Sequence, residues 1–225
     1  MDLQPLLGTD GGTLAPQRAI YYPVSDDRGE SGLQFYVVDI LVGQLKVYFQ
    51  SMEQQVLVGG NQFFYWERGN PASCLAPDVY VIEDEATPIR TVGAWKVWER
   101  DGKVPTLAFE VVSDEYEKDY DPRLLARYEA LGVRELFRFD PQARFMRRPV
   151  KNGPREVLSH FVRTSEGRLE KQPVDLQRGA KSAVYGFYLR PATDDSLRLF
   201  LRPGGLFPVD TPEERAAAEA QRAAA

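Results

Sequence analysis

The stretch that decides the fold is PTLAFEVVSDEYEKDYDPRLLARYEALGVRELFRFD, residues 105–140. Apolar residues fill both alternating sets of positions between Leu107 and Val112, which predicts a strand buried on both faces. Glu110 places one acid inside this apolar run. Burial of an unpaired carboxylate is strongly unfavourable unless a cation or hydrogen-bond donors compensate it. The sequence therefore predicts that Glu110 has a partner.

A helix and a second strand follow this strand. Asp121-Pro122 is a strong helix start, with an acid at the N-cap and proline at the first helical position, and Gly132 is a fitting terminator. The apolar stripe of this helix consists of Leu124, Leu125, Tyr128 and Leu131. A strand over Glu135–Phe139 completes a parallel strand-helix-strand crossover.

A second acid enters a strand upstream. Pro77 stiffens the start of the alternating run Asp78-Val79-Tyr80-Val81-Ile82, which reads as another strand. If this strand neighbours the one that carries Glu110, the carboxylates of Asp78 and Glu110 converge on one point. Two carboxylates on a rigid sheet, with room for water, suit a hard divalent cation such as Mg²⁺ (or Mn²⁺).

Three pieces of sequence in this order carry a family resemblance. They are Ala76-Pro77-Asp78-Val79, then Phe109-Glu110-Val111-Val112-Ser113, then the segment 128–136 with Phe139-Asp140-Pro141. Together they resemble the Uma-type family of restriction endonuclease-like proteins, a branch of the PD-(D/E)XK nuclease superfamily. The resemblance extends from Tyr22 to Glu214.

The resemblance implies a mixed α/β fold with a restriction-endonuclease-like core. A central mixed sheet is flanked by helices, with extra C-terminal strands and an alanine-rich C-terminal helix. It implies a Mg²⁺-dependent endonuclease that hydrolyses phosphodiester bonds in DNA, with Asp78 and Glu110 as catalytic metal ligands. Glu30 falls where the family often has a further acid, near a polar residue matched here by Gln34. The alternative for Glu30 is an acid that interacts with the N-terminal dipole of the following helix.

The sequence departs from the family at the basic residue. Val112 stands where the superfamily signature has lysine, and Leu124 stands where the Uma-type family often has it, four residues before Tyr128. Tyr120 replaces the acid that commonly precedes this lysine. Other basic residues are candidates to substitute in space: Lys96, Lys118, Arg123 and Arg127.

Two alternatives to an active nuclease therefore stay open. One is a catalytically degenerate nuclease fold that serves as a binding or assembly subunit, docking through the N-terminal arm or the C-terminal helix. The other is a fold of unrelated function in which Asp78 and Glu110 pair with arginines. A homodimer is a further candidate assembly.

Composition excludes several other classes of site. One cysteine, Cys74, and one histidine, His160, exclude a disulfide framework, a Cys-rich zinc site and multi-histidine metal sites. His160 lies in an alternating strand, which favours a structural role. The sequence has neither a signal-peptide pattern nor a long apolar run, which favours a cytoplasmic protein.

A net charge of -5 argues against a protein that coats nucleic acid indiscriminately. The segment from Arg134 to Arg155 is locally basic, however. We predict phosphate contacts from Arg144, Arg147, Arg148 and Lys151. A solvated strand-turn-strand is an equally good interpretation of the same charges.

We predict three parts of the chain: a flexible arm over residues 1–22, one endonuclease-like domain over 23–210, and a C-terminal helix over 211–225 with a capping box at Thr211. Within the domain, apolar spacing predicts a helix from Leu33 to Met52. Strands over 54–59 and 62–67 around Gly59-Gly60-Asn61 predict a hairpin.

Additional strands are predicted over 145–148, 156–162, 184–189 and 196–201. The segment Thr91–Glu99 carries Trp95 and Trp98, one helical turn apart. These tryptophans either stack on unpaired bases or pack on the rim of the core, and the second alternative is favoured.

Overall fold

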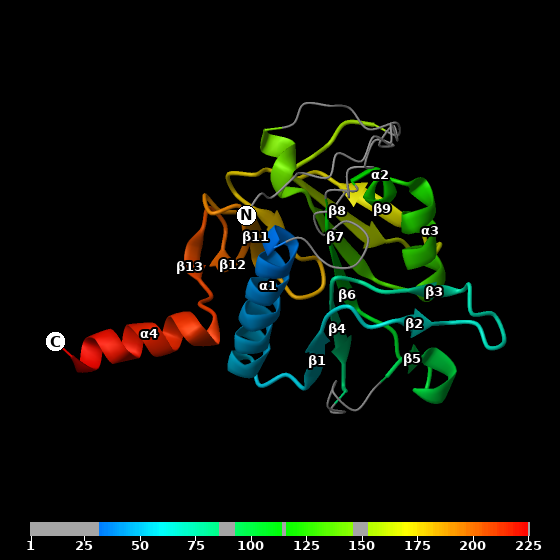
Figure 1. The fold of residues 1–225 in the computed structure, drawn as a ribbon, viewed down its shortest axis with the longest axis horizontal. Coiled ribbons are helices and arrows are strands. Elements are labelled where there is room, and N and C mark those ends of the chain that lie inside the picture. The colour runs from blue at the N-terminus through cyan, green and yellow to red at the C-terminus, as the bar shows by residue number, and fades with distance from the viewer. Residues whose placement is uncertain (1–31, 86–92, 114–115, 146–152, 225) are drawn as a thin grey trace, which may run out of the picture.

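The computed structural model describes residues 32–85, 93–113, 116–145 and 153–224. It has a mixed α/β architecture built on a six-stranded sheet, as predicted (Figure 1). In spatial order the strands of this sheet are β1 (Val56–Gly59), β4 (Val79–Glu83), β6 (Leu107–Val111), β7 (Glu135–Phe139), β8 (Leu158–Arg163) and β9 (Leu169–Gln172). Only the β6–β7 pair of this sheet is parallel, and its other neighbours run antiparallel.

Two smaller sheets complete the β structure. A four-stranded sheet contains β10 (Ala180–Lys181), β11 (Tyr188–Pro191), β12 (Leu197–Arg202) and β13 (Leu206–Pro208). A three-stranded sheet has the order β3 (Cys74–Leu75), β2 (Phe64–Tyr65), β5 (Trp95–Lys96). The helices are α1 (Gly32–Ser51), α2 (Tyr116–Asp119), α3 (Pro122–Leu131) and α4 (Pro212–Ala223), with short 3₁₀ turns η2 (Val97–Glu99) and η3 (Pro141–Arg144).

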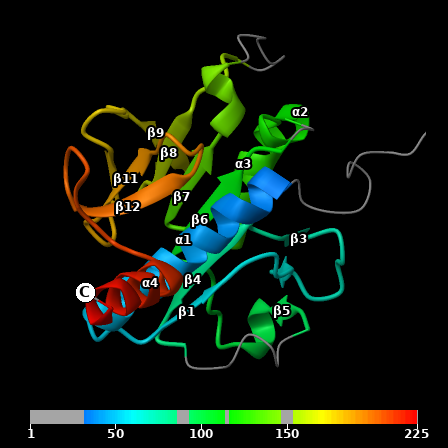
Figure 2. The ribbon, with the colours of Figure 1, turned by 60° about the vertical axis from the view of Figure 1, so that its left-hand side comes forward.

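The central sheet is buried on both faces because its strands are apolar at both parities. On one face, side chains such as Val79, Phe109 and Phe137 pack with α1 and the four-stranded sheet. On the other, Tyr80 and Ala108 pack with α3 and the small sheet. Figure 2 shows α1 in front of the central sheet, with β11 and β12 to its left.

Helix α1 fulfils the predicted helix almost to the residue. Its buried Gln44 is unusual in an otherwise apolar contact face. The Gln44 side chain accepts a hydrogen bond from Leu199 N (3.0 Å) and donates to the carbonyl of Val209. Because both partners are backbone groups of the C-terminal strand region, this amide attaches that region to α1.

Helix α3 has the predicted ends. The Asp121 side chain accepts a hydrogen bond from Arg123 N, and Gly132 ends the helix with φ of 97°, a left-handed conformation that glycine adopts without strain. Tyr128 and Leu131 are buried against the sheet, whereas Leu124 is half-buried. The crossover β6–α3–β7 is thus formed as predicted.

The predicted hairpin around Gly59-Gly60-Asn61 is wrong. Strand β1 pairs with β4, and β2 instead joins β3 and β5 in the small sheet. The turn redirects the chain because it packs on the segment before β4: Asn61 N donates to the carbonyl of Pro77 (2.9 Å). This contact is remote in sequence and outweighs the local turn signal.

Two predicted C-terminal strands also need correction. Phe145 follows η3, where the Asp140 side chain accepts a hydrogen bond from Ala143 N (3.0 Å), so it begins no strand. Residues 146–148 lie outside the described part of the chain. Residues 184–187 form a turn in which Ser182 Oγ accepts from Tyr185 N (3.0 Å), and β11 begins only at Tyr188.

The C-terminal helix α4 has the predicted capping box between Thr211 and Glu214. None of its residues is buried. Glu214 also pairs with Arg198 of β12 at 2.7 Å, which fixes the start of the helix against the four-stranded sheet.

Gly60 provides a test of how closely the turn packs against the backbone of Asp78. A Cβ at this residue would lie 2.4 Å from the carbonyl oxygen of Asp78, a backbone atom that cannot rotate away. We expect Gly60→Ala to lower the free energy of unfolding by about 1–3 kcal/mol. Urea unfolding followed by circular dichroism measures this effect.

Gly93→Ala is the matched control, because nothing lies within 4 Å of a Cβ at that residue. Equal stability of the two variants would contradict the proposed close approach of Gly60 to Asp78.

Candidate active site

Asp78 and Glu110 face each other across two adjacent strands. Val79 of β4 pairs with Phe109 of β6 in antiparallel register, so the next step of the ladder places Asp78 opposite Glu110. Both acids share the parity of Tyr80 and therefore the face of the sheet that α3 covers. The exposed fraction is 7% for Asp78 and 8% for Glu110.

Hydrogen bonds from different elements hold Asp78. The backbone N–H of Val111 donates to Oδ2 at 2.6 Å, and Nε2 of Gln34 in α1 donates to Oδ1 at 3.1 Å. A carboxylate has about four acceptor positions, so it can bind a metal ion in addition to such donors. Gln34, which the resemblance matched to a polar residue near Glu30, thus contacts Asp78.

Glu110 accepts a hydrogen bond from the hydroxyl of Tyr128, on α3. Within the described ranges no ion pair involves Glu110. This acid therefore lacks, in that part of the chain, the arginine partner that the alternative of a fold of unrelated function requires. Burial raises the pKa of Glu110 well above its usual range, and the neighbouring charge of Asp78 raises it further. Burial also raises the pKa of Tyr128, so its hydroxyl keeps the proton that it donates.

A third acid near Glu110 escaped the sequence analysis. Asp119 is buried and accepts hydrogen bonds from Ser113 N (2.9 Å) and Ser113 Oγ (3.2 Å). Burial raises the pKa of Asp119 despite these donors. The resemblance matches the family acid to residue 120, where this chain has tyrosine. Asp119 is the preceding residue, so a one-residue shift of the match would have identified it.

Two pockets open onto Glu110 and Asp119. The larger has a volume of about 490 Å³ and is lined by Leu75, Ala76, Glu110, Lys118, Asp119, Asp121, Arg123, Leu124 and Arg127. The smaller, of about 240 Å³, shares Glu110, Asp119, Asp121 and Leu124 with it. Leu124 therefore lies beside Glu110, where the resemblance placed the family lysine.

The larger pocket also contains three of the four candidate replacements for that lysine: Lys118, Arg123 and Arg127. The charge of Lys118 acts to lower the pKa of Glu110, against the larger effect of burial. Lys96 lines a separate pocket on the small sheet. Of the four candidates, Lys118 thus has the clearest electrostatic contact with the acids.

A buried ion pair and the contacts around it fix the segment that carries Asp119. Asp140 and Arg155 pair at 2.7 Å with almost no exposed surface, and the hydroxyl of Tyr120 donates to Asp140 at 2.9 Å. The guanidinium of Arg138 lies 4.0 Å from the centre of the Tyr120 ring and donates to the carbonyl of Asp119 (3.1 Å). These contacts hold the chain between β6 and α3 against β7 and β8.

Only part of the predicted basic patch lies within the described residues. Arg138 and Arg155 are used inside the protein and do not face a phosphate. Arg144 donates to the carbonyl of Ala192 at 2.9 Å. The other residues predicted to contact nucleic acid, Arg147, Arg148 and Lys151, lie outside the described residues, as does Glu30.

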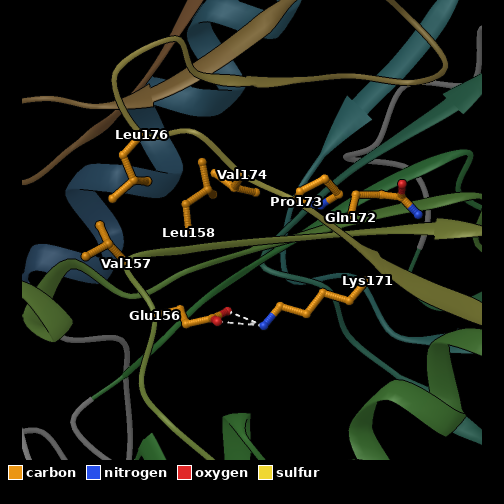
Figure 3. Close-up of a pocket in the computed structure, with 8 residues that line it drawn as sticks. All are labelled: Glu156, Val157, Leu158, Lys171, Gln172, Pro173, Val174 and Leu176. Atoms are coloured by element: carbon orange, nitrogen blue, oxygen red, sulfur yellow. Dashed lines mark hydrogen bonds and ion pairs between the residues drawn. The ribbon is translucent and has the colours of Figure 1, made fainter.

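Another pocket of about 490 Å³ lies between β8 and the chain after β9 (Figure 3). Its charged residues, Glu156 and Lys171, pair with each other at 2.6 Å, on the other side of the strands from the apolar side chains of Leu158 and Val174. Ser159 also donates to Glu156 at 2.8 Å. This carboxylate is fully compensated, in contrast with that of Glu110.

A family profile described as "Putative restriction endonuclease", Uma2, matches residues 28–177. The chain belongs to the Uma2 family. The matched segment contains Asp78, Glu110 and both pockets that open onto Glu110. The order α1, β1, β4, β6, α3, β7 is the restriction-endonuclease-like core expected from the sequence.

Other comparisons add less. A crystal structure of a "putative nuclease belonging to DUF820" from Anabaena variabilis is 9% identical, with a TM-score of 0.47, and the match covers 69% of this chain and 75% of that one. No curated protein matches the sequence. No helix in the described ranges has the length and apolar character needed to cross a bilayer.

The residues of this Uma2 site suit a Mg²⁺ ion. Two facing carboxylates with open space beside Glu110 match a cation that binds few protein carboxylates and keeps several waters. The unfavourable burial of Glu110 would be relieved by a cation. Among the described residues no group of three or more His, Cys, Asp or Glu side chains forms a fuller metal cage.

The raised pKa of Glu110 gives a prediction for stability. Folded protein keeps the Glu110 proton to a higher pH than unfolded protein, so stability falls as pH rises from the usual glutamate pKa through the raised folded value. Glu110→Gln removes this contribution, and the variant should lose less thermal stability than wild type as pH rises through that window. Mg²⁺ should raise the melting temperature of wild type at pH 8 and leave that of Glu110→Gln unchanged.

Differential scanning fluorimetry in EDTA and in Mg²⁺ measures both effects. Glu83→Gln is the control, because Glu83 lies at the far end of β4 and pairs with Arg134. An equal Mg²⁺ response in Glu110→Gln and wild type would rule out Glu110 as a metal ligand.

Proposed function

We propose that this Uma2 protein is a Mg²⁺-dependent endonuclease that hydrolyses phosphodiester bonds in DNA. The observation that supports it most is the pair Asp78 and Glu110, opposite each other in the β4–β6 ladder, with a pocket that opens onto Glu110. Membership of a family described as restriction endonuclease-like supports the same class of reaction. Mn²⁺ is an alternative ion of similar coordination chemistry.

In this proposal Asp78 and Glu110 hold the metal ion. When bound, the ion polarises the scissile phosphate and lowers the pKa of the attacking water. Gln34 and Val111 N fix the orientation of Asp78, and the Tyr128 hydroxyl fixes that of Glu110. Such fixed donors keep ligands in place, and their loss from metal sites typically weakens binding or activity by roughly 10–100-fold.

The chain must also offset charge on the phosphate. Lys118 lines the larger pocket with Glu110, and its ammonium acts on the pKa of that acid. We assign Lys118 this electrostatic role in place of the family lysine. Glu30 stays a candidate third carboxylate, placed by the family resemblance.

A specific observation favours the alternative of a degenerate nuclease fold. At the signature position of lysine, Val112 is buried in a small cluster with Tyr116 and Tyr120. At the other position, Leu124 adds an apolar wall beside Glu110. In the alternative, this loss abolishes cleavage and leaves the fold as a binding or assembly subunit.

Nicking of supercoiled plasmid in Mg²⁺ tests the proposed function. We expect wild type to nick DNA and Glu110→Gln and Asp78→Asn each to lower the rate by about 100-fold or more, since loss of a ligand exceeds loss of its supporting partner. Glu83→Gln should retain the wild-type rate. Wild-type activity that survives in both acid variants would rule out this site as the source of cleavage.

Leu124→Lys separates the active from the degenerate alternative. Leu124 is half-buried, so the substitution should cost about 1–3 kcal/mol of stability. The new ammonium would lie beside Glu110. If wild type is silent because only the lysine is lost, this variant should gain Mg²⁺-dependent nicking.

Ala126→Lys is the control, because Ala126 is an exposed residue of the same helix that lines neither pocket. A folded Leu124→Lys as silent as wild type would show that more than the lysine has been lost. Robust wild-type cleavage would show that another cation already serves.

A further inference from the structure

The two tryptophans of the segment before β6 have opposite environments. Trp95 of β5 is fully buried and donates its indole N–H to the carbonyl of Lys103 (2.9 Å), which confirms the core-packing interpretation for this residue. Trp98 in η2 is 36% exposed. It lines a surface pocket of about 310 Å³ with Tyr65 of β2, and packing of the core does not require its ring there.

This Trp98 pocket is completed by the turn between β2 and β3. The remaining walls come from Glu67, Gly69, Asn70, Pro71 and Lys96. Asn70 donates to Glu67 (2.8 Å) and to Ser73 Oγ (2.9 Å), and Ser73 Oγ donates to Glu67 (2.7 Å). The turn is therefore held in shape before any ligand arrives, which limits the entropy lost on binding.

The charges of the pocket disfavour a phosphate as its occupant. Hydrogen bonds from Ser73 and Asn70 lower the pKa of Glu67, so this wall is anionic at neutral pH. The ammonium of Lys96 pairs with Glu99 at 3.2 Å. Two aromatic side chains beside hydrogen-bonding groups instead suit a planar, uncharged ring with polar edges.

The pocket lies close to the acids along the chain. Tyr65 pairs with Cys74 across the β2–β3 ladder. Leu75 and Ala76, the next two residues, line the larger pocket with Glu110. From Cys74 to Asp78 there are four steps of chain, a span of at most roughly 13 Å. A few nucleotides of a single strand cover this span, since successive phosphates lie about 3.4 Å or more apart along a strand.

We propose that the Trp98 pocket binds an unpaired nucleobase of the strand whose phosphate is presented to Asp78 and Glu110, so that the preferred substrate is single-stranded or locally unpaired nucleic acid. The inference rests on the proposed function for the path of the strand. It goes beyond that function by naming the class of substrate. A base that stays stacked in a duplex has no free face to offer to an aromatic side chain of this pocket.

Binding of a fluorescein-labelled single-stranded oligodeoxynucleotide of about 12 nucleotides tests the proposal by fluorescence anisotropy. The measurement uses EDTA, so it does not depend on cleavage. We expect Trp98→Ala to weaken binding about 10-fold or more and Trp98→Tyr to restore most of the affinity, because base stacking requires only an aromatic face. Phe207→Ala is the control, since Phe207 is a 61% exposed aromatic on β13 and lies outside the pocket.

Two comparisons identify the ligand as a base. An oligomer of the same length with abasic sites should bind wild type and Trp98→Ala equally well. Blunt duplex DNA should likewise show little dependence on Trp98. Equal affinity of wild type and Trp98→Ala for the single strand, or failure of wild type to bind it at all, would overturn the proposal.

The outcomes separate this inference from the proposed function. Trp98-dependent binding without cleavage of any DNA would support the base pocket and reject the nuclease. Glu110-dependent cleavage at equal rates on single strands and duplex, unchanged by Trp98→Ala, would support the nuclease and reject the base pocket.

Discussion

The burial of the Glu110 carboxylate is the constraint on which the rest of this structure depends. A strand that enters a parallel crossover is covered on both faces, so an acid on β6 is largely removed from bulk water, and Glu110 reaches it only through the pockets that it lines. One neutral donor, the hydroxyl of Tyr128, compensates it only in part, and Asp78 across the ladder adds a like charge. The ends of α3 matter because they set Tyr128 over Glu110. The fold thus leaves the ionised form of Glu110 poorly compensated, and a bound cation would stabilise it. Glu110 lines both pockets, so a cation could reach it there.

The elements nearest Glu110 were predictable because their signals are local. The apolar run of β6, the Asp121 cap and the Gly132 terminator each act within a few residues, and the parallel crossover follows from chain chirality. The opposition of Asp78 and Glu110 needed one further assumption, that their strands are neighbours, and the β4–β6 ladder fulfils it. The small sheet was not predictable, since strands of two residues carry no periodicity. The local turn signal at Gly59-Gly60-Asn61 assigned β2 to a hairpin. The approach of Gly60 to the carbonyl of Asp78, which redirects the chain, is remote in sequence and gives no local signal.

Charge patterns were harder to interpret than apolar patterns. The basic segment from Arg134 to Arg155 supplies Arg138 and Arg155 to the interior, where the Tyr120 ring and the Asp140 carboxylate compensate their charges. A count of basic residues cannot separate such arginines from ones that face a phosphate, because the distinction depends on which acids and rings the fold brings near. Asp119 was missed for a related reason. Its carboxylate is placed by Ser113, on the other side of the turn, and a family pattern read residue by residue does not allow for a shift of one position.

The missing lysine and the raised pKa of Glu110 are two views of one arrangement. An ammonium at residue 124 would stabilise the ionised form of Glu110 whether or not metal is bound. With Leu124 in its place, an apolar side chain lies beside the acid. In the proposed metal site, protons and metal ions would compete for the Glu110 carboxylate. Metal affinity should then be linked to proton release, rising with pH until Glu110 is ionised in the metal-free protein. A site of this kind loads its ion readily only above that pH. Leu124→Lys should flatten the dependence, because the lysine ionises Glu110 before the metal arrives. The substitution would therefore change when the site can be occupied as well as what charge it presents to a phosphate.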